Sequence, residues 1–421
     1  MYQLTTLKNG IKIVTKELGD AKTANLTASF NAGSKYAPKG KEGLAHLLEH
    51  LIMNGSPKYP DPLLVKRRLA EIGGWSNAST SREYAKYVLK ILGENFKEGL
   101  EILFGSITAP LLTDENLEKE KRVIGEEINR SADSPQRRLA DAFYAVIFSG
   151  HPFSVPVKGT RETLEKITLE DAESFYQGFY SSRNLVLAAA GNLAHGELVK
   201  LAERNLSSLA SAELPPYKPF EFDPRGPRVS VLPEQSQQLR LLLAFPFKPK
   251  SFSEKARFRY LSRLLGGGGR LLARLREKEG LAYAVGAHFE YHADLSFIVV
   301  EGGFSLDKVP EVFYALTDEL MKVKKVEIKK EEFERIKTVL KTGILFGFED
   351  HNYWARFALN RLRMGEPLEP EDNLAELERI KPEEVQKLAR EIFVPENAYL
   401  AVVHKDKKPE EFSRLLAEGL A

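Results

Sequence analysis

Hydrophobic and polar residues follow two different periods in the first part of the chain. Alternation with period two in 11–17 and 25–33 predicts β-strands, and apolar residues at helical spacing predict helices at about 43–54 and 60–72. The segment 74–92 is typical of two further strands. The same criteria predict helices at about 94–108, 114–132, 135–147, 168–178 and 195–206, and a buried strand at 182–192.

The second half of the chain repeats this order. Strands are predicted at 228–234, 238–247, 281–292, 295–304 and 398–405. Helices are predicted at about 254–266, 308–324, 329–347, 351–364, 382–393 and 408–418. Because two halves of similar length share one order of elements, the pattern indicates a duplicated domain.

The stretch between the halves, 207–228, is rich in proline and polar residues and has neither period, which is typical of a linker. We therefore predict an α+β fold of two homologous domains, each a mainly antiparallel β-sheet covered by α-helices. The expected boundaries are 1–210 for the first domain, 211–228 for the linker and 229–421 for the second domain.

Composition narrows the possible chemistry. The 421 residues exceed what one ordinary core accommodates, which agrees with two domains. The 61 basic and 59 acidic residues leave a net charge of +2, which favours neither nucleic acid nor a membrane surface as partner. There is no cysteine, so any metal must be held by His, Asp or Glu. No signal-peptide or transmembrane pattern occurs, and we expect a cytoplasmic protein.

The stretch GLAHLLEHLIMNGS, residues 43–56, carries the most specific chemistry. On a helix, its leucines and an isoleucine form one apolar stripe, and His46, Glu49 and His50 lie on the opposite side. Histidines at i and i+4 stack one turn apart, so both imidazoles can reach one ion. The alternative is an ordinary solvated helix face, but the H-x-x-E-H pattern should arise by chance in only about one in a hundred such chains.

A hydrolytic zinc site also needs a third protein ligand. The acidic helix expected at 114–132, capped by Thr113 or Asp114, offers candidates. Glu120 and Glu127 are seven residues apart and share one helix face. Spacing alone does not choose among Glu118, Glu120, Glu126 and Glu127.

The chain resembles the family of pitrilysin, insulin-degrading enzyme and mitochondrial processing peptidase, the inverzincins, in which H-x-x-E-H is followed by an acidic helix. The resemblance implies one Zn²⁺ per chain, held by His46, His50 and Glu127, with Glu120 as a supporting carboxylate. It also implies that Glu49 is the general base for attack of zinc hydroxide on a peptide carbonyl.

Two further segments carry the resemblance. SNAST, residues 76–80, is similar to the family's edge strand, where Asn77 and the backbone of Ala78 would pair with an extended peptide. RLLARLREKEGLAYAV, residues 270–285, has the family's arginine and tyrosine seven residues apart. Arg276 and Tyr283 would then donate hydrogen bonds near the scissile carbonyl. Without the resemblance, a strand-end asparagine, a surface arginine and a buried tyrosine would be the simpler interpretations.

Two other motifs are expected to be structural. His151, in HPFSVPVKG, matches a family segment without a catalytic role. The run Gly266–Gly269 lacks the spacing of a phosphate loop, and we expect a flexible connection between helices that can touch substrate.

The resemblance implies a zinc endopeptidase that cleaves peptides or unfolded polypeptides in a closed chamber formed by four such domains. One chain supplies two domains, so a homodimer is expected. The alternatives are a heterodimeric processing peptidase with a homologous partner subunit, or a non-catalytic core or assembly subunit.

Overall fold

The computed structural model describes residues 1–421. The first half consists, in chain order, of β1 (Gln3–Thr6), β2 (Lys12–Glu17), β3 (Thr23–Phe30), α1 (Leu44–Met53), α2 (Pro62–Glu71), β4 (Gly74–Thr80), β5 (Ala85–Leu92), α3 (Phe96–Thr108), α4 (Asp114–Ala132), α5 (Pro135–Ile147), α6 (Arg161–Glu165), α7 (Leu169–Phe179), β6 (Leu185–Gly191) and α8 (His195–Asn205). None of the helices in the chain is long and apolar enough to cross a membrane.

The second half repeats this order without a counterpart of β1. It consists of β7 (Arg228–Leu232), β8 (Gln238–Phe247), α9 (Phe252–Leu265), a π-helix (Leu272–Lys278), β9 (Ala282–Tyr291), β10 (Ser296–Ser305), α10 (Val309–Lys325), α11 (Lys330–Glu349), α12 (His351–Met364), α13 (Pro370–Arg379), α14 (Pro382–Ile392), β11 (Tyr399–Val403) and α15 (Pro409–Leu420).

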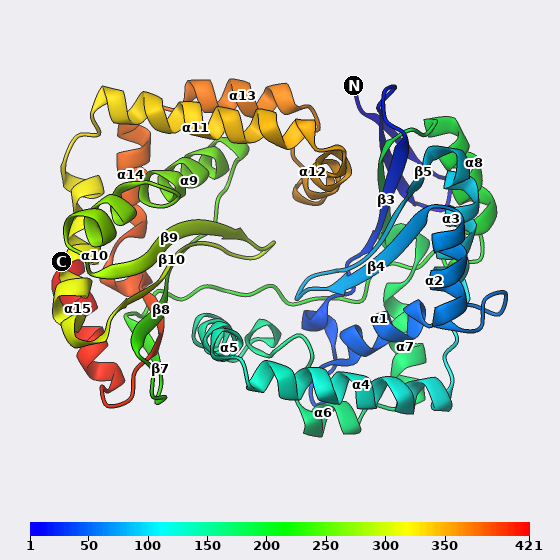
Figure 1. The fold of residues 1–421 in the computed structure, drawn as a ribbon, viewed down its shortest axis with the longest axis horizontal. Coiled ribbons are helices and arrows are strands. Elements are labelled where there is room, and N and C mark those ends of the chain that lie inside the picture. Colours follow the sequence, from blue (N-terminus) through cyan, green and yellow to red (C-terminus); the bar gives the residue numbers. More distant parts are fainter. The chain divides into compact units, whose positions relative to one another are not determined.

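Each half builds one β-sheet (Figure 1). The strand order is β1-β2-β6-β3-β5-β4 in the first sheet and β7-β11-β8-β10-β9 in the second. Apart from β1, the two orders correspond strand for strand. In each sheet one pair is parallel, β2 with β6 and β7 with β11, and the other pairs are antiparallel. The predicted α+β fold of two mainly antiparallel, helix-covered sheets is confirmed.

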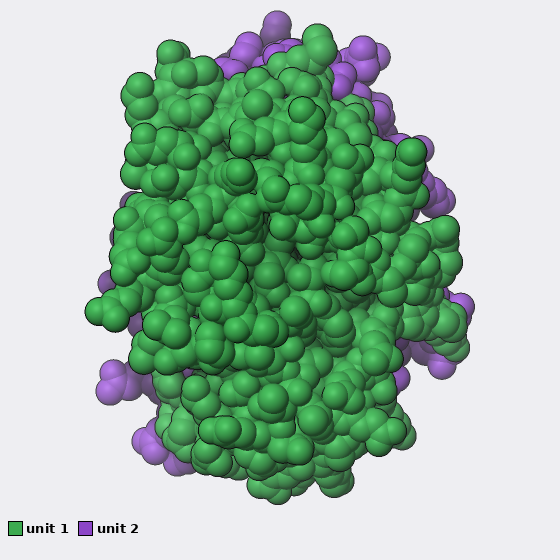
Figure 2. All heavy atoms as spheres, turned by 90° about the vertical axis from the view of Figure 1, so that its right-hand side faces the viewer, with its two compact units in different colours: residues 1–133, 155–218, 346–369 green, residues 134–154, 219–345, 370–421 purple.

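The two compact units are not contiguous in sequence, whereas the sequence analysis expects contiguous domains. Unit 1 comprises 1–133, 155–218 and 346–369, and unit 2 comprises the remaining segments, 134–154, 219–345 and 370–421 (Figure 2). Helix α5 therefore belongs to unit 2, where it packs on β11, β7 and β8. Helix α12 belongs to unit 1, where it packs on the corresponding strands β6, β2 and β3. The halves exchange equivalent helices.

The first sheet separates two hydrophobic clusters in unit 1. One face, which carries Tyr87, Leu89 and Ile91 of β5, packs with α1, α3, α7 and α8 in the main core. The other face packs Val14 and Ala188 against α12. Alternating side chains point to opposite faces of a strand, so the period-two pattern of β5 sends one set into the core and leaves the other set towards the second face.

Candidate metal centre

Helix α1 is fixed in place at its first turn by two glycines. Gly43 precedes the helix with φ of 101°, and a Cβ there would lie 2.5 Å from the carbonyl oxygen of Lys158. Gly159 also has positive φ, and a Cβ there would lie 2.1 Å from the carbonyl oxygen of Glu42. Only glycine allows both backbones to approach this closely. The contact brings the Lys158 loop beside the start of α1.

The apolar stripe of α1 lies in the core, as the pattern predicts. Its members are at most 1% exposed: Leu44, Leu47, Leu48, Leu51 and Ile52. Because this stripe is anchored, the histidines on the opposite side of the helix face α4, which packs against α1. The hydrophobic pattern predicts both helices, and the structure places them side by side (Figure 1).

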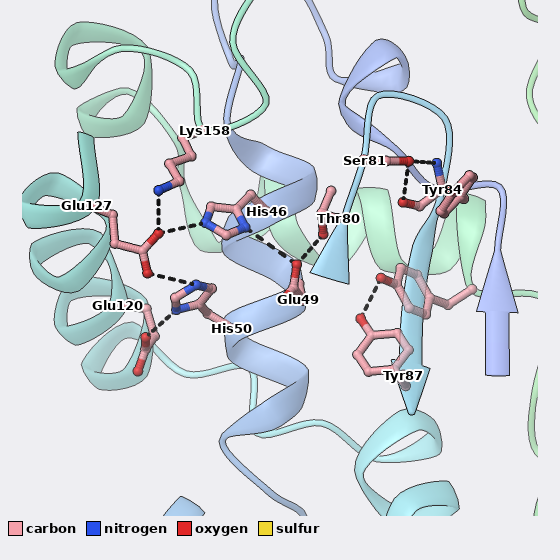
Figure 3. Close-up of polar contacts among 11 residues, drawn as sticks. His46, Glu49, His50, Thr80, Ser81, Tyr84, Tyr87, Glu120, Glu127 and Lys158 are labelled. Carbon is pink, nitrogen blue, oxygen red and sulfur yellow. Dashed lines mark hydrogen bonds and ion pairs between the residues drawn. The ribbon is translucent and has the colours of Figure 1, made fainter. Parts of the chain in front are cut away.

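Three side chains from α1 and α4 converge on one point (Figure 3). His46 Nε2 lies 3.4 Å from Glu127 Oε2, and His50 Nε2 lies 3.9 Å from Glu127 Oε1. One ligand atom from each of the three residues lies within 4.8 Å of the others. Tetrahedral zinc with bonds of about 2.1 Å separates its ligands by roughly 3.4 Å. The donor types and their spacing therefore fit a zinc ion.

Glu120 orients His50. Its Oε2 lies 2.9 Å from His50 Nδ1, and burial opposes ionisation of this carboxyl. The hydrogen bond with His50 outweighs burial and lowers the pKa of Glu120 below its usual value. An ionised carboxylate only accepts, so Nδ1 of His50 carries a hydrogen and Nε2 is the nitrogen that a metal ion on the side of Glu127 would use.

Lys158 is a neighbour of the centre that the sequence analysis misses. Its Nζ lies 2.8 Å from Glu127 Oε2. Burial tends to raise the pKa of Glu127, but the hydrogen bond of Lys158, its charge and the nearby histidines lower that pKa. A cation held by Glu127 would share the carboxylate with this ammonium group. Proximity of Lys158 to α4 depends on the loop after residue 150, so no spacing pattern indicates it.

Glu49 is buried beside His46, on the same side of α1. Its Oε2 lies 3.4 Å from His46 Nδ1 and accepts a hydrogen bond from the hydroxyl of Thr80, at the end of β4 (Figure 3). The carboxylate is thereby held by two partners near the three-residue cluster. Thr80 is the second contact that the sequence analysis misses, since it lies 31 residues further along the chain.

Strand β4 forms the free edge of the first sheet, close to Glu49. The amide of Leu92 donates to Gly73 O, and the amide of Ser81 donates to Tyr84 O, so odd-numbered residues of β4 bond to β5. The even-numbered residues, including Ala78, direct their amide and carbonyl groups to the open edge. Asn77 is exposed and points its side chain to the face opposite α1. The geometry leaves the backbone of Ala78 accessible for pairing.

Arg276 and Tyr283 lie in unit 2, on the π-helix and at the start of β9. The Tyr283 side chain is exposed, at 77%, and borders an open pocket of about 730 Å³. Arg276 has a 54% exposed side chain and a single weak ion pair, with Glu277 at 3.6 Å. Neither residue is buried. The sequence without the resemblance favours a buried tyrosine, and the exposure of Tyr283 differs from that expectation.

His151 and the glycine run, both expected to be structural, lie in unit 2. The ring of His151 stacks with Phe153, and its Nδ1 accepts from the Phe153 amide at 3.3 Å. In the glycine run, Gly266 approaches β9 so closely that a Cβ would lie 2.1 Å from Ala287 O, and Gly267 and Gly268 have positive φ. The run is thus a tight connection between α9 and the π-helix.

Comparisons with known proteins identify the family of the chain. Residues 12–161 match the family model of insulinase, peptidase family M16, and residues 166–340 match that of the peptidase M16 inactive domain. An uncharacterized zinc protease of Rickettsia felis is 30% identical over 93% of this chain and 95% of its own length. The uncharacterized zinc protease YmxG of Bacillus subtilis is 25% identical over 97% of this chain and all of its own length.

A solved structure shares the fold. The crystal structure of a protease from Helicobacter pylori superposes with a TM-score of 0.88 at 23% identity, covering 96% of this chain and 99% of the other. The two family models match segments in both halves, and the first spans the segment that bears His46, His50 and Glu127. The chain belongs to peptidase family M16.

Proposed function

We propose that this protein is a zinc-dependent endopeptidase that cleaves extended peptides or unfolded polypeptides. The convergence of His46, His50 and Glu127 from two packed helices carries the proposal. Relatives named zinc proteases support it. These three side chains would hold the ion. When bound, zinc lowers the pKa of water towards about 7 and polarises the substrate carbonyl.

The remaining residues around the cluster have separate tasks. Glu49 takes the proton from the attacking water and returns it to the leaving amine, because its carboxylate lies beside the ligand cluster. Thr80 holds one oxygen of Glu49, which keeps the carboxylate in one orientation. Glu120 keeps the ring of His50 in the ligand orientation.

The free edge of β4 would bind the substrate by adding a strand. Main-chain pairing at Ala78 recognises any extended peptide, and it excludes folded chains whose backbone is already paired. The peptide would run past Glu49, because Thr80 at the end of the same strand contacts that carboxylate. Arg276 and Tyr283 would donate hydrogen bonds to the carbonyl oxygen as it gains charge.

A homodimer fits this distribution of residues. The zinc residues belong to unit 1, and Arg276 and Tyr283, both accessible, belong to unit 2. We propose that unit 2 of one chain completes the site of the other chain and that the paired units enclose the substrate.

One experiment tests the activity directly. The purified chain is incubated with a mixed set of unstructured peptides, with and without a chelator, and the products are identified by mass spectrometry. We expect internal cuts that disappear with the chelator and return with added Zn²⁺. Cuts that persist after removal of the metal, or no cuts from the zinc-loaded chain, would contradict the proposal.

A further inference from the structure

The part of the first sheet nearest its free edge has one face that no helix covers. Side chains at Trp75 and Lys90, and at Ser79 and Lys86, lie opposite one another in the register of β4 and β5 and share this face. Trp75 is 51% exposed. Helix α12 covers the same face only over β6, β2 and β3, where the hydrophobic cluster ends. We call the uncovered area, with Trp75, Asn77, Ser79, Lys86, Val88 and Lys90, the outer face of β4 and β5.

This outer face carries two lysines, and the carboxylate at its end, Glu83 in the turn between β4 and β5, pairs with Lys35 at 3.5 Å and also acts on Arg363. Lys86 and Lys90 are half-buried, and neither forms an ion pair within 4.0 Å. Lys86 has only the ring of Tyr84, 4.8 Å from its Nζ. Arg363 of α12 adds a cation at the same end, over the Tyr84 ring at 3.7 Å. The carboxylate of Asp350 caps α12 instead, accepting from the amide of Asn352.

The geometry of strand addition places a bound peptide beside these lysines. A peptide paired with β4 would lie one strand spacing from β4 and two spacings, roughly 10 Å, from β5. Every second side chain of the peptide would point to the outer face. The extended side chains of a peptide glutamate on this face and of a lysine on β5 are together long enough to cover the distance between the peptide and β5.

We propose that the outer face of β4 and β5 selects substrates with acidic side chains at alternate positions, through Lys86 and Lys90. The proposal rests on the proposed function, because strand addition at β4 brings the peptide to this face. Trp75 supplies an adjacent aromatic surface for an apolar neighbour in the peptide. The lysines would set specificity without touching the reacting atoms.

Matched peptides test the preference. A quenched peptide with glutamates on every second residue around the cut is compared with a version that has glutamines there. A third peptide carries the same glutamates displaced by one residue relative to the cut. We expect kcat/KM to be about fivefold to tenfold higher for one glutamate register than for glutamine, as two partly exposed ion pairs would give. The advantage should shrink in 1 M salt, where the Debye length is about 3 Å.

Variants assign the preference to the two lysines. Lys86→Gln with Lys90→Gln should bring kcat/KM for the glutamate peptide down to that for the glutamine peptide. The control is Lys97→Gln with Lys200→Gln, which removes the same charge from α3 and α8 on the other side of the sheet and should keep the preference. Equal kcat/KM for the three peptides with the unaltered chain overturns the proposal. So does a preference that survives the Lys86 and Lys90 substitutions.

Binding measured in the presence of a chelator separates this inference from the proposed activity. Fluorescein-labelled glutamate and glutamine peptides are titrated with the full chain, and anisotropy reports their affinity. If no peptide is cleaved but the glutamate peptide binds more tightly through Lys86 and Lys90, the proposed activity fails and the selective face stands. If the double variant changes only the sedimentation of the chain, the face is a contact between copies and the inference is wrong.

Discussion

The two units share one order of strands in their sheets but differ in the helix that follows β3 in unit 1 and its counterpart β8 in unit 2. In unit 1 that helix is α1, whose polar side has two histidines and a glutamate. In unit 2 it is α9, whose sequence FSEKARFRYLSRLL contains no histidine. The following acidic helices differ as well, because Glu127 of α4 meets two imidazoles, while Glu332 of α11 is paired with Arg270 at 2.6 Å.

This difference shows that one scaffold can carry two different sets of side chains. Both units bury the apolar side of the helix and both place an acidic helix nearby, so the fold alone does not make a metal centre. Glu332 pairs with an arginine, which has no lone pair to offer, whereas Glu127 pairs with Lys158 and also faces two imidazoles whose nitrogens can bind a cation. The match of 166–340 to a model described as an inactive domain agrees with a second half without a metal ligand set.

The largest effect is expected from removing the carboxylate that distinguishes α4. Glu127→Gln should lose bound zinc on dialysis and reduce peptide hydrolysis to background, because a neutral amide is a poor zinc ligand. Zinc per chain is measured by atomic emission. The matched control is Glu126→Gln, whose side chain is exposed and 3.5 Å from Arg161. Loss of zinc in Glu126→Gln but not in Glu127→Gln would show that Glu126, and not Glu127, is the ligand.

Glu49→Gln should separate catalysis from metal binding. We expect kcat to fall about 10²-fold to 10⁴-fold, the usual contribution of a general base, while zinc stays at one per chain. The hydroxyl of Thr80 can still hydrogen-bond the amide oxygen, so the fold should be kept. Stopped-time assays and zinc analysis of the same sample give both values. Wild-type kcat in this variant would remove Glu49 from the mechanism.

Tyr283→Phe should remove the hydrogen bond that unit 2 is proposed to donate to the substrate carbonyl. Loss of one donor to a developing oxyanion lowers kcat by about 10²-fold, and zinc content should not change. Mixing this variant with Glu49→Gln then tests the dimer. If Tyr283 acts on the other chain, mixed dimers contain one intact site, and the mixture should recover about a quarter of wild-type activity. A mixture that remains inactive after subunit exchange would place both residues in the same chain's site.

The smallest effect is expected in unit 2, at the ion pairs of His288 with Glu290 and Glu301. Hydrogen bonds with Glu290 and Glu301 raise the pKa of His288 to about 9, against the effect of burial. A raised pKa in the folded chain means that the ion pairs stabilise it fully below about pH 6.5 and that this stability is lost as pH rises through 9.

His288→Gln should therefore destabilise unit 2 by about 1 kcal/mol at pH 6, since the ring is 42% exposed and solvent screens the pairs. Melting curves at pH 6 and pH 10 check the sign. The variant should melt below the wild-type chain at pH 6 and equally at pH 10, and a larger gap at pH 10 would contradict the assignment.

Local patterns predicted much of the fold because they depend on neighbours in sequence. The helical stripe of α1 and the limits of α4 at 114–132 follow from spacing within a few residues. The sequence offered Thr113 or Asp114 as the cap of α4, and the structure has Thr113. The short strand β1 was missed, since its four residues are mostly exposed and have no apolar alternation. The repeated order of elements predicted the duplicated domain, whereas the order of strands in each sheet came from the structure.

The sequence by itself determined which side of α1 bears His46, Glu49 and His50, because a helix converts spacing into a face. Only the tertiary structure decided that Glu127 meets both histidines, that Lys158 and Thr80 hold the neighbouring carboxylates, and that α5 and α12 change units. The pattern of an amphipathic helix shows that one of its sides must be buried, but not which of two equivalent sheets covers that side. Contacts between residues far apart in the chain depend on packing, and no local period encodes them.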